Sequence, residues 1–156
     1  MKAKIEVKAS KAQLCINGVS YPCALGKHGW VEGAMGREGD GKTPLGRYGF
    51  RYVLYRADRV SLPVCNLPAH PLRPDDGWCD APDDPAYNRP VRLPYPARAE
   101  SLWRDSPVYD VIVVLGHNDN PPKPGLGSAV FFHVAREVYG PTQGCVAVSK
   151  EHMLEI

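Results

Sequence analysis

The sequence lacks several features that would assign the protein to a familiar class. It has no apolar run of about 18 residues and no charged-then-apolar amino terminus, so we expect neither membrane insertion nor an uncleaved signal peptide. The net charge is +2 and no block of lysine or arginine stands out, which disfavours nucleic acid or a membrane surface as partner. The absence of CxxC pairs excludes the usual zinc-knuckle and redox motifs.

Cysteines are few and odd in number. Five cysteines cannot all form disulfides within one chain, so at least one thiol is free. The two nearest, Cys15 and Cys23, flank an Asn-Gly turn signal, which predicts a hairpin over residues 2–24 with Cys15 opposite Ser20. In that register the two thiols point to opposite faces, so we predict no disulfide between them.

Proline and glycine, in contrast, are abundant. Sixteen prolines and fifteen glycines disfavour long helices and are typical of a protein made of strands and loops. A chain of 156 residues fits one globular domain, residues 1–156. We therefore predict a mostly β (β-rich α+β) single domain in which residues 57–107 form a long Pro-rich loop or lid, with one or two helical turns over residues 97–104.

The remaining elements follow from hydrophobic patterning. The run YDVIVVLG at residues 109–116 predicts a strand buried on both faces, and residues 47–54 and 128–134 predict two more. A turn at residues 43–46 leads into the first of these, and a helix begins at Lys150. Residues 26–49 are rich in glycine and form either a long connection or a wall that faces a substrate.

One segment, VFFHVAREVYGPTQGCVAVS at residues 130–149, combines an imidazole with a thiol. His133 ends one apolar run, and Gly144-Cys145 opens a second one twelve positions later. If the two strands pair, His133 can act as the base that activates a Cys145 nucleophile, and the main-chain N–H groups at residues 144 and 145 can stabilise an oxyanion. Spacing alone leaves two alternatives: Cys145 packs in the core, or His117, His133 and Cys145 bind zinc with Cys79.

The order of the motifs resembles that of the L,D-transpeptidase (YkuD) catalytic domains, in their compact single-domain bacterial branch. The resemblance rests on REGDGKTPLG, the WCD and YN pairs, VVLGHN and FFHVAREVYGPTQGCVAV, which together span residues 26–149. It implies two packed mixed sheets with peripheral short helices and no cofactor. It also implies that Cys145 is the acylated nucleophile, that His133 activates it, and that Gly144 and Cys145 supply the oxyanion hole. In this family a backbone carbonyl often orients the histidine.

The function implied by the resemblance is a peptidoglycan L,D-transpeptidase. Such an enzyme joins a donor and an acceptor stem peptide by 1-3 or 3-3 cross-links through a cysteine thioester, and carbapenems are expected to inhibit it. Its place of action would be the bacterial cell envelope or periplasm. The same fold would also suit an L,D-carboxypeptidase or amidase, or a cell-wall binding domain without catalytic activity.

The chain departs from the family pattern next to the nucleophile. Thr142 takes the place of the usual serine, Gln143 stands where many members have histidine, and Ala147 stands where most have arginine. The missing arginine would have been a cation suited to a stem-peptide carboxylate. We expect Arg37, Arg136 or His117 to replace it, and the other candidate substrate-binding residues are Trp78, Tyr87, Asn88, Asn118, Thr142 and Gln143.

Overall fold

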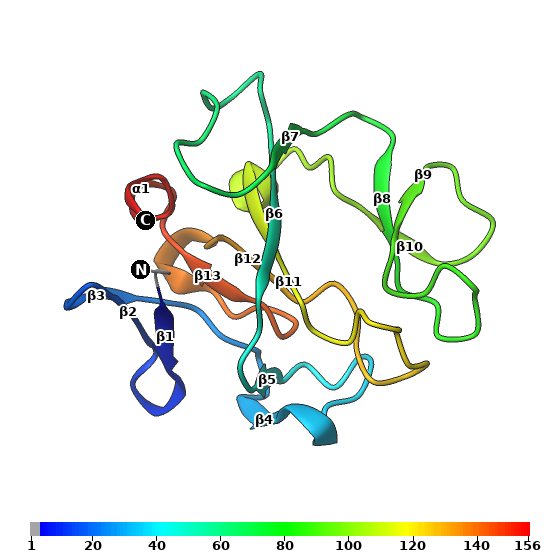
Figure 1. The fold of residues 1–156 in the computed structure, drawn as a ribbon, viewed down its shortest axis with the longest axis horizontal. Coiled ribbons are helices and arrows are strands. Elements are labelled where there is room, and N and C mark those ends of the chain that lie inside the picture. The colour runs from blue at the N-terminus through cyan, green and yellow to red at the C-terminus, as the bar shows by residue number, and fades with distance from the viewer. Residues whose placement is uncertain (1–3) are drawn as a thin grey trace.

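A five-stranded sheet runs through the centre of the protein (Figure 1). The computed structural model describes residues 4–156, and the strand order of this sheet is β13-β12-β11-β6-β7. It is mixed, because β11 is antiparallel to β6 and β12 whereas β7 and β13 are parallel to their neighbours. Its strands are β6 (Phe50–Tyr55), β7 (Ala69–Pro71), β11 (Val111–Leu115), β12 (Phe131–Val134) and β13 (Val146–Val148).

Three smaller sheets surround the central one. The first is antiparallel and contains β1 (Ile5–Lys8), β2 (Gln13–Ile16) and β3 (Val19–Pro22). The second, also antiparallel, has the order β10-β8-β9, with β8 (Asp76–Cys79), β9 (Pro90–Arg92) and β10 (Ala99–Ser101). The third pairs β4 (Trp30–Glu32) with β5 (Thr43–Leu45) in parallel. The prediction of a β-rich fold is confirmed, although the described residues form four sheets rather than two.

Helices are short and peripheral, as predicted. The α-helix α1 (Lys150–Glu155) begins after Ser149, whose side chain accepts a hydrogen bond from the His152 N–H and so caps the first turn. The others are single 3-10 turns: η1 (Ala9–Lys11), η2 (Gly33–Met35), η3 (Pro107–Tyr109) and η4 (Glu137–Tyr139). Within residues 4–156, no helix has the length and apolar character needed to cross a membrane.

The central sheet is buried on both faces, which explains the continuous apolar run in β11. Because side chains alternate along a strand, Val111 packs on one face and Ile112 on the other. The first face is covered by the β1–β3 sheet and α1, and its buried residues include Leu14, Tyr21, Phe132, Val146 and Met153. The second face is covered by the β8–β10 sheet, and its buried residues include Trp78, Leu102, Tyr109, Phe131 and Cys145.

The amino-terminal hairpin forms in the predicted register, with one addition. Asn17 and Gly18 both have positive φ (50° and 80°), as a tight two-residue hairpin turn requires, and Cys15 pairs with Ser20. Both Cys15 and Cys23 are free thiols, as predicted. The first strand is interrupted by η1, so that β1 folds back beside β2 and the hairpin becomes a three-stranded sheet.

The prediction for residues 57–107 was wrong in part. This segment contains β7 and the complete β8–β10 sheet, in addition to its turns. Strands of three or four residues between prolines are too short to show a period, which is why the sequence suggested a loop. Residues 99–101 form a strand paired with β8 instead of helical turns, and residues 43–45 form β5 instead of a turn.

Candidate active site

The pairing of β12 with β13 brings His133 and Cys145 to the same face of the central sheet. The two strands are parallel, with Phe132 opposite Val146 and His133 opposite Ala147, so Cys145 lies beside Phe131. Residues two apart on a strand share a face, and the side chains of Cys145 and His133 therefore project in the same direction. Both line one pocket of about 490 Å³. The expected pairing across the link is confirmed, and the chain achieves it with a crossover rather than a hairpin.

The Cys145 thiol is held by main-chain groups. Its Sγ donates to the carbonyl oxygen of Ala129 at 3.2 Å and accepts from the N–H of Phe131 at 3.4 Å. Burial raises the pKa of Cys145 to about 12; the Phe131 N–H acts in the opposite direction, and the negative charge of Glu100 adds to the increase. In the resting pocket the sulfur is thus a protonated thiol.

The imidazole of His133 is set up as a neutral base. Its Nδ1 lies 2.9 Å from the carbonyl oxygen of Val134, and an Nδ1–H donated there leaves Nε2 free to accept a proton. Burial lowers the pKa of His133, although the carbonyl groups of Val134 and Val108 oppose the decrease. The ring of Tyr109 meets the imidazole edge-on, with centroids 5.3 Å apart. Val134 thus provides a carbonyl that orients the histidine.

The turn before Cys145 requires glycine at position 144. Gly144 has φ = 140°, and a Cβ atom there would lie 2.7 Å from the carbonyl oxygen of Lys42. Thr142 braces the same turn: its Oγ1 accepts from the Gly144 N–H at 3.1 Å and donates to the Cys145 carbonyl at 2.7 Å. The sequence between the two strands is therefore fixed by backbone geometry as well as by chemistry.

Charged residues from two other segments form the opposite wall. The Gly-rich segment contributes Gly36 to Asp40 and Lys42, so this part of residues 26–49 does face the pocket. Glu100 of β10 and residues next to β8 and β10 contribute two ion pairs, Arg98 with Asp80 at 3.0 Å and Arg104 with Glu100 at 3.0 Å. Sequence reasoning missed Arg98, Glu100 and Arg104 because residues 97–104 were expected to be helical.

Glu100 is the most perturbed carboxyl group in this wall. Its side chain is 24% exposed, Arg104 lies on one side, and the Tyr109 hydroxyl donates to both carboxylate oxygens at 3.2 and 3.3 Å. Burial raises the pKa of Glu100 to about 7, and the charge of Arg104 and the Tyr109 hydrogen bond act against the increase. A carboxyl group with this pKa can change its protonation state near neutral pH.

Comparison with known families shows to which family a chain with this site belongs. The L,D-transpeptidase catalytic domain (YkuD) family matches residues 3–156, which is nearly the whole chain. The chain belongs to the L,D-transpeptidase family. Its members are associated with the cell wall and act on peptidoglycan peptides. No curated protein and no solved structure matches the chain.

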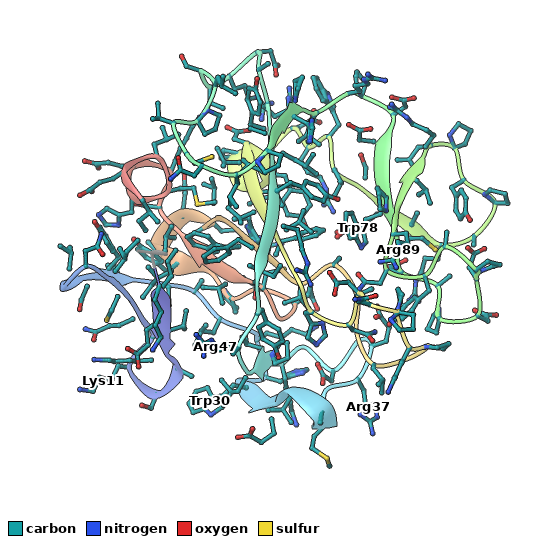
Figure 2. The ribbon with its side chains drawn as sticks, viewed as in Figure 1. Lys11, Trp30, Arg37, Arg47, Trp78 and Arg89 are labelled. Atoms are coloured by element: carbon teal, nitrogen blue, oxygen red, sulfur yellow. The ribbon has the colours of Figure 1, made fainter. Side chains whose placement is uncertain are left out.

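The position where most L,D-transpeptidases carry arginine is occupied by a buried alanine in this chain. Ala147 is fully buried, pairs with His133 across the sheet, and exchanges two main-chain hydrogen bonds with Ala24. A larger, charged side chain would have to be buried there. Arg37 and Arg136, the two arginines expected to replace the missing cation, both line the pocket. Arg37 donates to the carbonyl oxygens of Ala34 and Gly36 and lies at the outer edge of the molecule (Figure 2).

Arg136 and His117 have unused hydrogen-bonding capacity in the pocket. Within the described residues 4–156, the guanidinium of Arg136 makes no hydrogen bond or ion pair, and it is exposed at the pocket rim beside Gly140. His117 is only 7% exposed, and its Nδ1 has no partner in the same part of the chain. Burial lowers the pKa of His117, so it is a neutral side chain near pH 7. Gln143 also lines the pocket and is exposed to solvent.

Trp78 and Asn88, expected to bind substrate, instead support the residues that surround the nucleophile. Trp78 projects from β8 toward the central sheet and meets Phe131 edge-on at 5.0 Å (Figure 2). Its indole N–H donates to Asn88 Oδ1 at 2.9 Å, and the same oxygen accepts from the Ala129 N–H at 3.0 Å. Since the Ala129 carbonyl binds the Cys145 thiol, Asn88 is two hydrogen bonds away from the nucleophile.

Tyr87 and Asn118 also lie behind the pocket surface rather than on it. The Tyr87 hydroxyl donates to Glu38 at 2.6 Å and accepts from the N–H of Gly127 at 3.0 Å. The Asn118 amide donates to the carbonyls of Lys123 and Gly127. These two residues fix the loop that carries Gly127 to Ala129 along the pocket, so the structure brings them near the site without exposing them to it.

The four residues of the alternative zinc site do not come together. Cys79 faces Asp84, with its sulfur 3.8 Å from Oδ1, and is not part of the pocket lined by His117, His133 and Cys145. Throughout residues 4–156, no group of three or more His, Cys, Asp or Glu side chains is arranged to hold a metal ion.

Proposed function

We propose that this protein is a peptidoglycan L,D-transpeptidase that forms stem-peptide cross-links through a thioester on Cys145, with residues 1–156 acting as one catalytic domain. The observation that carries the proposal is the parallel pairing of β12 and β13. It puts a thiol and a neutral imidazole on one sheet face, in one pocket, in a chain whose family acts on peptidoglycan peptides.

The neutral state of both groups determines how acylation proceeds. Burial raises the pKa of Cys145 and lowers the pKa of His133, so both shifts disfavour a resting thiolate–imidazolium pair. The sulfur therefore attacks the donor amide carbonyl as Nε2 of His133 removes its proton. His133 then protonates the leaving amine, and a thioester remains.

The developing oxyanion needs a main-chain donor next to the sulfur. The Gly144 N–H already donates to Thr142 Oγ1, so we assign this role first to the N–H of Cys145, with Gly144 setting the course of the turn. Donors of this kind are worth roughly 10²–10³ in rate.

In the second half-reaction, the side-chain amine of a diaminopimelate residue in the acceptor stem attacks the thioester, with His133 as base. If water attacks instead, the product is that of an L,D-carboxypeptidase or amidase. Exclusion of water therefore separates the two activities. We assign that task to the Gly-rich segment and to the sheet within residues 57–107, which together form the wall opposite the nucleophile.

Donor recognition is proposed to depend on Arg136. Its guanidinium is unpaired in the described residues, is always charged, and can bind a carboxylate with two hydrogen bonds. His117 and Gln143 offer neutral hydrogen-bonding groups in the same pocket, and Arg37 offers a second cation at its mouth. The cross-link formed, 1-3 or 3-3, depends on how this group of residues holds the donor. The substrate implies the bacterial envelope as the place of action.

The test uses purified muropeptides and mass spectrometry. We expect cross-linked dimers from the native protein and none from Cys145→Ser. We also expect an intact-mass adduct with a carbapenem that Cys145→Ser abolishes. Shortened monomers without dimers would favour the carboxypeptidase or amidase instead. If Cys145→Ala changes no product, the protein is a binding domain and the proposal is wrong.

A further inference from the structure

Glu100 lies in the same pocket as the nucleophile, and the reaction described so far gives it no role. It comes from β10, which is paired with β8, so the strand ladder fixes the position of its backbone. Its carboxylate is fixed by Arg104 and the Tyr109 hydroxyl, and the Tyr109 ring packs edge-on against the imidazole of His133. A mobile surface carboxylate would not be held in this way.

The second half-reaction creates a demand that His133 alone does not meet. A primary amine with the ordinary pKa of about 10.4 is an ammonium ion at neutral pH, and it cannot attack until it loses a proton. A second proton must leave nitrogen as the new amide forms. The neutral imidazole can accept one proton and pass it to the departing sulfur, so one further proton acceptor is needed. Water as the attacking group has no such additional requirement.

We propose that Glu100 is a specificity-determining residue that binds the primary ammonium group of the acceptor and removes its first proton, so that the thioester reacts with an amine in preference to water. This inference depends on the proposed function, because it concerns how the same thioester is resolved. The acceptor is thus any primary amine that can reach the β10 side of the pocket in its protonated form.

The Glu100 carboxylate takes one proton from the ammonium and becomes a carboxylic acid. The freed lone pair attacks the thioester carbon, the C–N bond forms, and the C–S bond breaks. The second proton on nitrogen passes through His133 to Cys145 Sγ, so the products are an amide, a thiol and protonated Glu100, which loses its proton to solvent.

The charged groups around Glu100 favour its ionised form only in part. Arg104 and the Tyr109 hydroxyl lower its pKa, whereas burial and the negative charges of Asp80 and Glu38 raise it to about 7. Arg98 neutralises Asp80 and reaches Glu38 at 3.8 Å. Cys145 lines the same pocket and senses the charge of Glu100, and its thiol is neutral at this pH. Glu100 is therefore ionised above neutral pH, where it can accept a proton.

The experiment measures the ratio of amine transfer to hydrolysis for one donor stem peptide, with diaminopimelate as acceptor, across pH 5 to 10. In the native protein we expect the ratio to rise through about pH 7 and then level off, as Glu100 ionises. In Glu100→Gln we expect it to be at least about tenfold lower at pH 7 and to rise about tenfold per pH unit, because only free amine reacts. Tyr109→Phe removes a hydrogen bond that lowers the Glu100 pKa, so the inflection should move to higher pH.

Acylation is followed separately by the carbapenem adduct. Glu100→Gln should not slow it, because removing this charge lowers the pKa of Cys145. Glu6→Gln, which removes an exposed acid on β1, should leave the transfer ratio unchanged. An unchanged ratio in Glu100→Gln, or equal losses of acylation and transfer, would overturn the inference while leaving the thioester intact. Failure of the native protein to acylate would instead overturn the proposed function.

Discussion

The two walls of the pocket are built in different ways. The wall that carries Cys145 and His133 belongs to the central sheet, and its side chains are placed by strand register and held by main-chain groups. The opposite wall consists of glycine-rich backbone and ion pairs on short strands and loops. The first wall fixes the distance between nucleophile and base, whereas the second can change its residues without disturbing that distance. We therefore expect chemistry to depend on the first wall and selectivity on the second.

The sharpest test of this division is His133→Asn. Asparagine removes the base from the sheet wall and leaves the strand intact, and we expect acylation to slow about 10²–10⁴-fold. The rate of carbapenem adduct formation measures it. Because burial lowers the pKa of His133, the native acylation rate should begin to fall at a lower pH than the titration of an ordinary imidazole would give. His70→Asn, at an exposed histidine on β7, is the control, and a comparable loss there would show that the assay reports folding.

Gly144→Ala should cause the next largest loss of acylation rate, because it alters the turn that precedes Cys145. The new methyl group would lie 2.7 Å from the Lys42 carbonyl oxygen in addition to the strained φ. We expect the free energy of unfolding to fall by about 1–3 kcal/mol, and acylation to fall roughly tenfold to a hundredfold as Cys145 shifts. Gly125 also has a positive φ, of 79°, but no atom lies near its Cβ position, so Gly125→Ala shows the cost of a positive φ without the clash. Equal effects would exclude the steric explanation.

Asn88→Ala tests whether the two walls are linked. The change leaves the indole N–H of Trp78 and the N–H of Ala129 without their acceptor. We expect the free energy of unfolding to fall by about 2–3 kcal/mol, as measured by urea denaturation, and acylation to fall less than in Gly144→Ala. Asn66→Ala removes an exposed asparagine and should change neither quantity. Full stability in Asn88→Ala would contradict the bracing role.

The smallest effect is expected for Arg136→Gln, at the rim. If Arg136 binds the donor carboxylate, the KM for a donor stem peptide should rise about fivefold to tenfold, with kcat nearly unchanged. Arg47→Gln removes another exposed arginine outside the pocket and should leave both constants as they are. A decrease in kcat alone would mean that Arg136 acts on the transition state rather than on donor binding.

The difference between the two walls also explains how much of the fold and of the site could be predicted from the sequence. Long apolar runs predicted β11 and β12, because burial on both faces leaves a continuous hydrophobic signal. Patterning alone left alternatives for His133 and Cys145, and their roles were predicted from the resemblance to the L,D-transpeptidases. Asn17-Gly18 predicted its hairpin for a local reason, since few residue pairs tolerate two positive φ angles. The sheet β8–β10 was missed, since strands this short between prolines depend on tertiary pairing. Glu100 was missed with it. Asn88 was selected as a substrate contact because an exposed amide and a buried bridging one look alike in sequence.

The hydrogen bonds around Cys145 Sγ have a consequence for the survival of the protein under oxidative stress. Peroxides and general alkylating reagents react with thiolates, and burial raises the pKa of Cys145 so far that its sulfur is a thiol at pH 7. Sulfur enclosed between the Ala129 carbonyl and the Phe131 amide is also shielded from collision. Exposed Cys65 has no such enclosure. A reactive group that is inert until a base takes its proton can persist in an environment that would inactivate a preformed thiolate.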